Sequence, residues 1–299
     1  MRTFARQLCT DGIQMRQHPI EVLLADVRNC VANALAEDIG TGDISAALVP
    51  ASRQASARVI CRDDAVICGR PWVDEVLLQV DPTLRITWRV ADGQEVAAGS
   101  ELFVIDGCAR SILTVERTAL NFLQLLSGTA TATRAALALV AGTTTRLLDT
   151  RKTVPGLRTA QKYAVRCGGG RNHRLGLFDA FLIKENHIAA AGGISAAVRA
   201  ARVFDAGLMV EVEVETLEQL EEAIRGGADL VMLDNFELPR MREAVALCAG
   251  RTLLEASGGI SVQELSAIAA TGVDFVSVGA LTKHVHAVDL SLRFATVAD

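Results

Sequence analysis

The chain has 299 residues, half of them hydrophobic, and 35 acidic against 30 basic side chains give it a formal net charge of −5. This length allows one large α/β domain or two domains with full cores. The acidic balance excludes a general attraction to nucleic acid or to an anionic membrane. No basic stretch carries interleaved aromatic residues of the kind that bind single strands.

The cysteines and the N-terminal residues predict a cytoplasmic protein. The seven cysteines are odd in number and form no Cys-x-x-Cys pair, which favours reduced thiols over a disulfide framework or a zinc site. Arg2 and Arg6 are not followed by an apolar run, so we expect no secretory signal. No apolar run is long enough to span a bilayer, and we expect no membrane partner.

The N-terminal region predicts a helix after an irregular start. Residues 1–18 show no clear hydrophobic period, and we expect a ragged N-terminus there. From residue 19 to about residue 38, apolar side chains recur at helical spacing and predict one helix. The acidic, turn-rich segment 37–43 follows as a loop.

Residues 53–108 predict a small α+β domain. The segments 57–62 and 84–90 alternate apolar and polar residues, as strands do, and a helix is expected between them over 73–80. The second strand runs into Asp92-Gly93. Because this dipeptide lies between alternating runs, it predicts a hairpin.

A long helix is predicted over residues 111–140. Its apolar stripe comprises Val115, Ala119, Phe122, Leu123 and Leu126. Its opposite face carries Arg117, Asn121 and Gln124. Such a polar face indicates either ordinary exposure to solvent or a surface that meets a site or a partner subunit. The sequence pattern does not decide between these two interpretations.

From residue 145 onward, short apolar runs alternate with helical segments. The expected strands are 146–149, 180–184, 209–213, 230–234, 252–255 and 275–278. Capping boxes at Thr216-x-x-Gln219 and Ser261-x-x-Glu264, and Pro239 at a helix start, mark the helices between them. Such repeats predict parallel strands with crossover helices. A barrel is the first expectation, and an open doubly wound sheet is the alternative.

Polar residues follow each of these six runs, and in a barrel they would share one rim with the active site. The segment 149–187 concentrates positive charge, which indicates a pocket for an anionic small molecule. The rim cations are Arg151, Lys152, His173, Arg174 and Lys184, and the rim carboxylates are Glu213 and Asp234. Cations suit carboxylates and phosphates, and carboxylates opposite a phosphate suit Mg²⁺.

Glycines follow the last two expected strands, at Ser257-Gly258-Gly259 and at Gly279. A Gly-Gly pair is usually only a turn. Phosphate-binding loops of barrels commonly occupy these two strand ends, however, with backbone N–H groups facing the anion. The sequence shows no Ser-His-Asp arrangement, no Gly-x-Gly-x-x-Gly and no Walker loop.

Several segments resemble the quinolinate phosphoribosyltransferase family, the decarboxylating nicotinate-nucleotide pyrophosphorylases, most closely those of bacterial type. The segments are 116–121, 149–158, 168–177, 183–187, 211–215, 232–236 and 277–282. The resemblance implies the type II phosphoribosyltransferase fold. In that fold an N-terminal α+β sandwich, here 19–140, precedes an incomplete parallel α/β barrel, here 141–299. The C-terminal tail is expected to return to the N-terminal domain.

The resemblance also implies the activity. The family are pentosyltransferases, nicotinate-nucleotide diphosphorylases (carboxylating). They transfer phosphoribosyl from phosphoribosyl pyrophosphate to quinolinate with Mg²⁺, giving nicotinate mononucleotide, pyrophosphate and CO₂ in NAD biosynthesis. We therefore expect a homodimer or a higher oligomer, with two small-molecule substrates and no nucleic acid.

The resemblance further assigns roles to residues of this chain. Arg151, His173, Arg174 and Lys184 match residues that hold the quinolinate carboxylates, and Arg117 matches an arginine supplied in trans by the neighbouring subunit. Catalytic roles fall to Lys152, near the pyrophosphate, to Lys184, and to Glu213 and Asp234, which face the ribose and Mg²⁺. The residues that match the loops binding the 5′-phosphate in the family are Ser257, Gly258, Gly259 and Gly279.

Three other functions remain open from the residues alone. One is a related phosphoribosyltransferase that uses another pyridine or aromatic acid, such as nicotinate. Another is a barrel lyase that forms a Schiff base on Lys184. The third is a sensor that binds a phosphorylated ligand without turnover.

Overall fold

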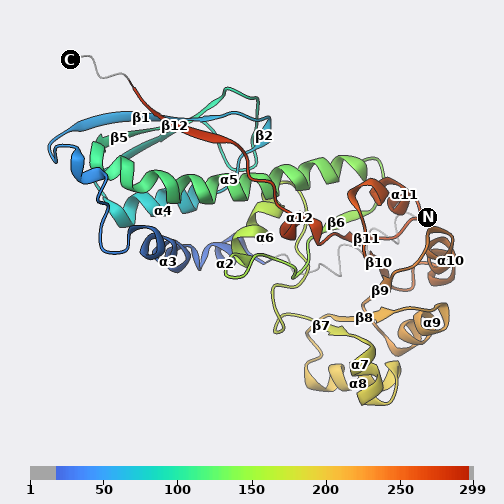
Figure 1. Cartoon of the computed structure of the whole chain (residues 1–299). Coiled ribbons are helices and arrows are strands. Elements are labelled where there is room, and N and C mark those ends of the chain that lie inside the picture. The colour runs from blue at the N-terminus through green and yellow to red at the C-terminus, as the bar shows by residue number, and fades with distance from the viewer. Residues whose placement is uncertain (1–17, 296–299) are drawn as a thin grey trace. The chain divides into compact units, whose positions relative to one another are not determined.

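The computed structural model describes residues 18–295, which divide into two compact units that interleave along the chain (Figure 1). The barrel unit comprises 135–152 and 170–280, and the sandwich unit comprises 18–134, 153–169 and 281–295. Apart from His18, the expected ragged N-terminus lies outside the described residues. Two segments that follow barrel strands in the sequence thus belong to the sandwich unit.

The sandwich unit contains an antiparallel sheet in the order β12-β1-β5-β3. Its strands are β1 (Gln54–Cys61), β3 (Arg85–Trp88), β5 (Glu101–Cys108) and β12 (Leu290–Phe294). Every second residue of β1, at Ala57, Val59 and Cys61, is fully buried, as expected for a sheet with one face against a core. A separate pair joins β2 (Ala65–Val66) to β4 (Glu95–Val96).

Helices α2 (Ile20–Leu24), α3 (Val27–Ile39), α4 (Arg70–Val80) and α6 (Arg158–Cys167), with the 3-10 turn η1 (Ala46–Leu48), complete the sandwich unit. The single helix predicted over 19–38 is wrong in one respect, since the helix breaks at Asp26. The Asp26 backbone (φ −98°, ψ 2°) leaves the helical region, and its carboxylate accepts from the Asn29 amide at 3.5 Å. Aspartate competes for local hydrogen bonds in this way and favours helix starts.

The hairpin predicted at Asp92-Gly93 is also wrong, because β3 pairs with β5 while β4 pairs with β2. The Asp92 carboxylate accepts the backbone N–H groups of Gly69 and Arg70, at 3.1 and 3.2 Å, and the Tyr163 hydroxyl at 2.7 Å. Asp92 therefore caps the start of α4 and anchors α6. These contacts hold the Asp92 turn against α4 and α6, and the strand that pairs with β3 is β5, further along the chain.

Helix α5 (Ala109–Leu139) is 31 residues long and runs from the sandwich unit into the barrel unit. Its predicted apolar stripe, from Val115 to Leu126, is buried, and Arg117 and Asn121 on the opposite face are exposed. The predicted helix and its faces are confirmed. In the described part of the chain, no helix combines the length and apolar character that crossing a membrane requires.

The barrel unit is built on a six-stranded sheet whose paired strands are all parallel, in the order β6-β11-β10-β9-β8-β7. The strands are β6 (Arg146–Leu148), β7 (Phe181–Ile183), β8 (Val210–Val214), β9 (Leu230–Asp234), β10 (Leu253–Ser257) and β11 (Phe275–Ser277). All six predicted strands are confirmed. From β7 to β11 and on to β6 the order follows the chain without the reversal of a doubly wound sheet. The sheet is an incomplete barrel, open between β6 and β7.

Crossover helices connect the barrel strands, as Figure 1 shows. They are α7 (Glu185–Ala191), α8 (Ile194–Phe204), α9 (Leu217–Gly226), α10 (Leu238–Cys248), η2 (Val262–Glu264) and α11 (Leu265–Ala269). The short helix α12 (Ala280–Lys283) follows β11, the last barrel strand, and precedes β12. The predicted capping boxes at Thr216 and Ser261 are present. Leu230, Leu253 and Phe275, the first residues of their strands, form a buried cluster with Leu148. Apolar side chains thus fill the amino end of these strands, which leaves the carboxyl ends for chemistry.

Candidate active site at the barrel rim

A cleft of about 410 Å³ opens at the carboxyl ends of the barrel strands, and all of its lining residues belong to the barrel unit. The lining residues are Thr150, Arg151, Lys152, His173, Arg174, Leu182, Lys184, Glu213, Met232, Asp234, Ser257, Gly258 and Ser277. These strand ends converge because parallel strands of a barrel finish at one rim. All the rim cations and both rim carboxylates expected from the sequence meet in this one cleft.

The remaining predicted residues lie around the cleft or elsewhere. Gly279 adjoins it, because a Cβ at Gly279 would be 3.0 Å from Cδ of Lys152. Gly259 lines a neighbouring pocket of about 440 Å³ that shares Gly258 with the cleft. Arg117 is exposed on α5 in the sandwich unit and is not among the cleft residues of the described chain.

The guanidinium groups of Arg151 and Arg174 lie close enough to act on each other. Burial, and after it the charge of Arg151, lowers the pKa of Arg174, while Glu211 and Asp179 act in the opposite direction. Bringing two cations together costs free energy that an anion recovers on binding. This side of the cleft is therefore built for a ligand with more than one negative charge.

The loop that carries His173 and Arg174 is held by two carboxylates. Fully buried Asp149 accepts the backbone N–H of His173 at 2.8 Å and the Asn172 amide at 2.6 Å. Asp179 accepts two further backbone N–H groups of the loop, from Leu175 at 2.6 Å and Gly176 at 3.0 Å. Asp149 begins the basic segment recognised in the sequence, and the structure shows that it fixes the path of this segment.

Lys184 and Glu213 form an ion pair between Nζ and Oε2 across the cleft. The Lys184 side chain is 46% exposed and that of Glu213 is 17% exposed. Lys184 is also the N-cap of α7, and its backbone N–H donates to Nδ1 of His187 at 3.0 Å. This cap fixes the backbone of Lys184 at the rim, while its ammonium group stays within reach of a ligand.

The glycine turn after β10 has a backbone that other residues cannot adopt. Gly258 has φ +97°, and a Cβ there would be 2.2 Å from Oδ1 and 2.7 Å from the backbone N of Asn235. Asn235 itself has φ +55° and donates its N–H to the carbonyl of Ser257 at 3.0 Å. The turns after β9 and β10 therefore pack against each other, so the Gly258 backbone can approach a phosphate closely.

The rim carboxylates Glu213 and Asp234 supply hard oxygen ligands on two neighbouring strands. Asp234 accepts from the Asn235 amide at 2.9 Å. In residues 18–295 the clusters of at least three metal-ligating groups are Cys68/Asp92/Cys167 and His173/Glu211/Glu255, so Glu213 and Asp234 form no closed cage. Two partly buried carboxylates that line an open cleft fit Mg²⁺ that completes its shell with substrate phosphates and water.

A buried ionisable cluster adjoins the cleft at His173, and no role was assigned from the sequence to two of its members. Glu211 and Glu255 are fully buried, and Nε2 of His173 lies 3.0 Å from Oε2 of Glu211 and 3.6 Å from Oε2 of Glu255. Burial, and after it the charge of Glu211, raises the pKa of Glu255 to about 8. One sequence signal could have found them: each stands two residues before a rim residue, Glu213 or Ser257, and so faces the same side of its strand.

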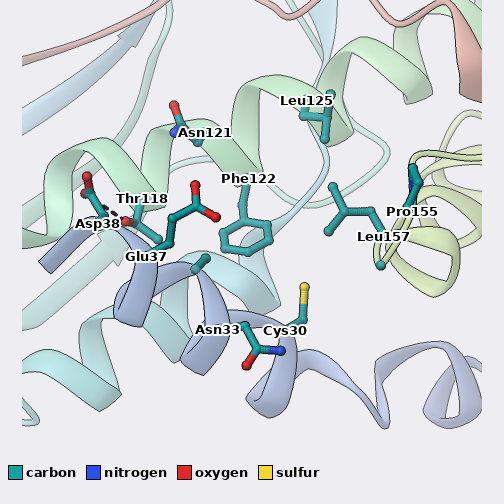
Figure 2. Close-up of a pocket in the computed structure, with 12 residues that line it drawn as sticks. Cys30, Asn33, Glu37, Asp38, Thr118, Asn121, Phe122, Leu125, Pro155 and Leu157 are labelled. Atoms are coloured by element: carbon teal, nitrogen blue, oxygen red, sulfur yellow. Dashed lines mark hydrogen bonds between the residues drawn. The ribbon is translucent and has the colours of Figure 1, made fainter. Parts of the chain in front are cut away.

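A second pocket, of about 400 Å³, lies within the sandwich unit between α3, α5 and residues 155–157 (Figure 2). Asp38 and Thr118 meet at its edge, where the Thr118 hydroxyl lies 3.2 Å from Oδ2 of Asp38. Asn121, from the predicted polar face of α5, lines this pocket beside Phe122. Part of the polar face of α5 therefore borders a pocket rather than a flat surface.

Two family models match the chain. Residues 43–127 match the N-terminal domain of quinolinate phosphoribosyl transferase, and residues 129–293 match its C-terminal domain. The chain belongs to the quinolinate phosphoribosyltransferase family. The resemblance found in the sequence and the expected fold class are thereby confirmed.

Individual members of this family are similar to this chain over nearly its whole length. It is 44% identical over 275 residues to the nicotinate-nucleotide pyrophosphorylase (carboxylating) of Mycobacterium leprae, covering 89% of this chain and 96% of that protein. The solved nicotinate-nucleotide pyrophosphorylase of Francisella tularensis superposes with a TM-score of 0.89 at 51% identity, covering 94% and 99% of the two chains. A further solved member, from Streptococcus pyogenes, gives a TM-score of 0.87 at 38% identity, covering 90% and 97%.

Proposed function

We propose that this protein is a nicotinate-nucleotide pyrophosphorylase (carboxylating), a pentosyltransferase of NAD biosynthesis. It transfers phosphoribosyl from phosphoribosyl pyrophosphate to quinolinate, with loss of CO₂, to give nicotinate mononucleotide and pyrophosphate. The observation that carries this proposal is the cleft, in which arginine and lysine cations face two carboxylates at the barrel rim. Family membership and its relatives support the same reaction.

The acid substrate is proposed to bind among Arg151, Arg174 and Lys184. Quinolinate carries two adjacent carboxylates, and two neighbouring guanidinium groups offer paired donors that match them. Nicotinate carries one carboxylate and would leave one of these cations without a partner. This is the reason to prefer quinolinate over a related aromatic acid.

The sugar substrate is proposed to lie across the rest of the rim. The glycine turns at Gly258, Gly259 and Gly279 would take the 5′-phosphate, with the hydroxyl of Ser257 beside them, and Lys152 would face the pyrophosphate. Glu213 and Asp234 would face the ribose and hold Mg²⁺. When bound, this ion would neutralise charge on the departing pyrophosphate.

Chemistry in this cleft would proceed by positioning and charge stabilisation. The pyridine nitrogen forms a bond to the ribose C1 as the bond from C1 to pyrophosphate breaks, so positive charge develops on the ribose. Glu213 and Asp234 are placed to stabilise that charge. The ring nitrogen then carries a positive charge, which stabilises the carbanion left at C2 when CO₂ departs, and the electron pair of this carbanion takes up a proton. Lys184 would orient the departing carboxylate and supply the proton.

The pairing of Lys184 argues against the lyase alternative. Its ammonium group is paired with Glu213, whereas a Schiff base requires a neutral amine. Trapping with borohydride and a carbonyl substrate tests this point. A covalent adduct on Lys184 would favour the lyase.

We further propose a homodimer or a higher oligomer in the cytoplasm, with Arg117 supplied in trans. Arg117 is exposed on α5 and lies outside the cleft residues of the described chain, so it is available to a neighbouring subunit. The six cysteines of the described residues are free thiols, as a reducing compartment requires. Mixed oligomers test the arginine: an Arg117→Ala subunit combined with a Lys184→Met subunit should regain activity that neither variant has alone.

The first experiment is an assay with quinolinate, phosphoribosyl pyrophosphate and Mg²⁺ that follows CO₂ and the mononucleotide together. Equal yields that disappear when the metal is chelated would support the proposal. A mononucleotide formed only from nicotinate would overturn the assignment of the acid. Binding of the sugar phosphate without turnover would favour the sensor.

A further inference from the structure

The His173 ring uses both of its nitrogens away from the cleft. Nδ1 accepts the backbone N–H of Arg174 at 2.7 Å, so the ring proton resides on Nε2. Nε2 lies 3.0 Å from Oε2 of Glu211 and 3.6 Å from Oε2 of Glu255. A neutral ring in this tautomer offers no N–H to a ligand in the cleft.

The buried pair lies where it can hold this ring from below. Glu211 is on β8 and Glu255 is on β10, the two strands that flank β9. Leu182, which pairs with Glu211 in the sheet, and Met232, which pairs with Glu255, both line the cleft. Glu211 and Glu255 themselves are fully buried and are not among the lining residues, whereas His173 is, so His173 lies between the pair and a ligand in the cleft.

The groups that face Glu255 come from every element packed around it. They are Glu211 from β8, His173 and Asp149 from the segment that follows β6, and the Ser277 hydroxyl of β11. Glu211 and Asp149 disfavour its charge and His173 and Ser277 favour it, with burial the largest effect. Glu255, Glu211 and His173 thus form one buried cluster, in which one nitrogen or oxygen atom of each residue lies within 4.8 Å of the others.

We propose that Glu211 and Glu255 are positioning residues that hold His173 as a neutral Nε2–H ring, and that this ring fixes the backbone of Arg174 for the acid substrate. The chain of contacts begins at Oε2 of Glu211 and Oε2 of Glu255, which lie 3.0 and 3.6 Å from Nε2 of His173. It continues through the ring to Nδ1, which accepts the backbone N–H of Arg174. His173 thus acts through Arg174, instead of contacting the acid itself. This inference rests on the proposed function for its choice of substrate.

Steady-state kinetics of matched variants test the chain of contacts. Glu211→Gln should raise the KM for quinolinate about tenfold or more, since small displacements of a binding group are costly, and should change the KM for phosphoribosyl pyrophosphate less than about twofold. Glu255→Gln keeps a neutral donor and should leave the KM for quinolinate unchanged. Glu255→Ala removes this donor and should raise that KM. Glu221→Gln, an exposed site on α9, is the control.

Two kinetic outcomes would overturn the proposal. One is a Glu211→Gln enzyme with the wild-type KM for quinolinate. The other is an equal loss for both substrates, which would indicate a general structural role. Thermal unfolding of each variant separates these outcomes from misfolding.

Ring ¹⁵N spectra of the wild-type protein give a readout that needs neither turnover nor a variant that folds. The His173 signals are assigned by their absence from the spectrum of His173→Asn. They should report a neutral ring protonated at Nε2 over a range of about three pH units, from pH 6 to pH 9. Conversion to an imidazolium in that range, or protonation at Nδ1, would overturn the proposal. If the wild type showed this tautomer but did not use quinolinate, the proposed function would fail while the positioning contacts stood.

Discussion

Replacing Glu255 with glutamine should stabilise the barrel unit at neutral pH. Glu255 is fully buried and its pKa is raised from 4.5 to about 8. In the unfolded chain this carboxyl ionises near pH 4.5, whereas in the folded state it stays protonated up to about pH 8. Its contribution to stability is therefore largest below pH 4.5 and falls as the pH rises, by about 1.4 kcal/mol per pH unit, until the folded-state pKa is passed.

The size of the effect follows from the same two pKa values. At pH 7 the cost of keeping Glu255 protonated corresponds to the interval from 4.5 to 7, or about 3 kcal/mol. Glutamine has nearly the same shape and no charge to suppress. Glu255→Gln should therefore raise the free energy of unfolding by about 3 kcal/mol at pH 7 and by much less at pH 5.

The assay must report on the barrel unit. Both tryptophans of the chain, Trp72 and Trp88, lie in the sandwich unit, so their fluorescence does not follow β10. Urea unfolding by far-ultraviolet circular dichroism, with hydrogen exchange of β10 amides at each pH, does follow it. The exposed control Glu221→Gln should leave the pH profile unchanged. The reasoning would be refuted if the free energy of unfolding depended on pH in the same way for the wild type and Glu255→Gln. It would also be refuted if Glu255→Gln were less stable than the wild type at pH 7.

Three other substitutions have defined outcomes. Gly258→Ala places a Cβ 2.2 Å from Asn235 at φ +97°, so the KM for phosphoribosyl pyrophosphate should rise about 10- to 100-fold in steady-state assays, with the quinolinate KM nearly unchanged. Arg174→Lys keeps the charge but loses the two-pronged donor and should raise the quinolinate KM about tenfold; an unchanged KM would remove Arg174 from the acid site. Thr216→Ala removes an observed helix cap and should lower the urea-unfolding free energy by about 1 kcal/mol, leaving both KM values as they are.

The sequence predicted the barrel well because its local signals and its tertiary structure agree. Each apolar run from residue 146 to residue 278 is short, buried and bounded by capping residues, so period and length alone identify the strands. The rim then follows from geometry, since the carboxyl ends of parallel strands must lie together. This explains why residues as distant in sequence as Arg151 and Ser257 could be placed in one cleft.

The wrong hairpin and the two unassigned glutamates have one cause, which is that the partner of the side chain is distant in sequence. Asp92 carries a local turn signal, but it caps α4 and contacts Tyr163, 71 positions along the chain. In the sequence Glu211 and Glu255 have the pattern of polar strand ends, and only the assembled sheet shows that they are buried against His173. No pattern within a short window distinguishes a buried carboxylate from one exposed at the rim.

The edge strand β12 has a consequence for how this protein is made. Its residues Leu290–Phe294 pair with β1, which begins at Gln54, so the sheet of the sandwich unit lacks a strand until residues 290–294 have been synthesised. On the ribosome, all barrel strands from β6 to β11 are synthesised before that edge is covered. Until then the exposed edge of β1 could pair with another nascent chain. We expect ribosome-bound chains that stop before Leu290 to be protease-sensitive in β1 and to depend on chaperones, although their barrel sequence is complete.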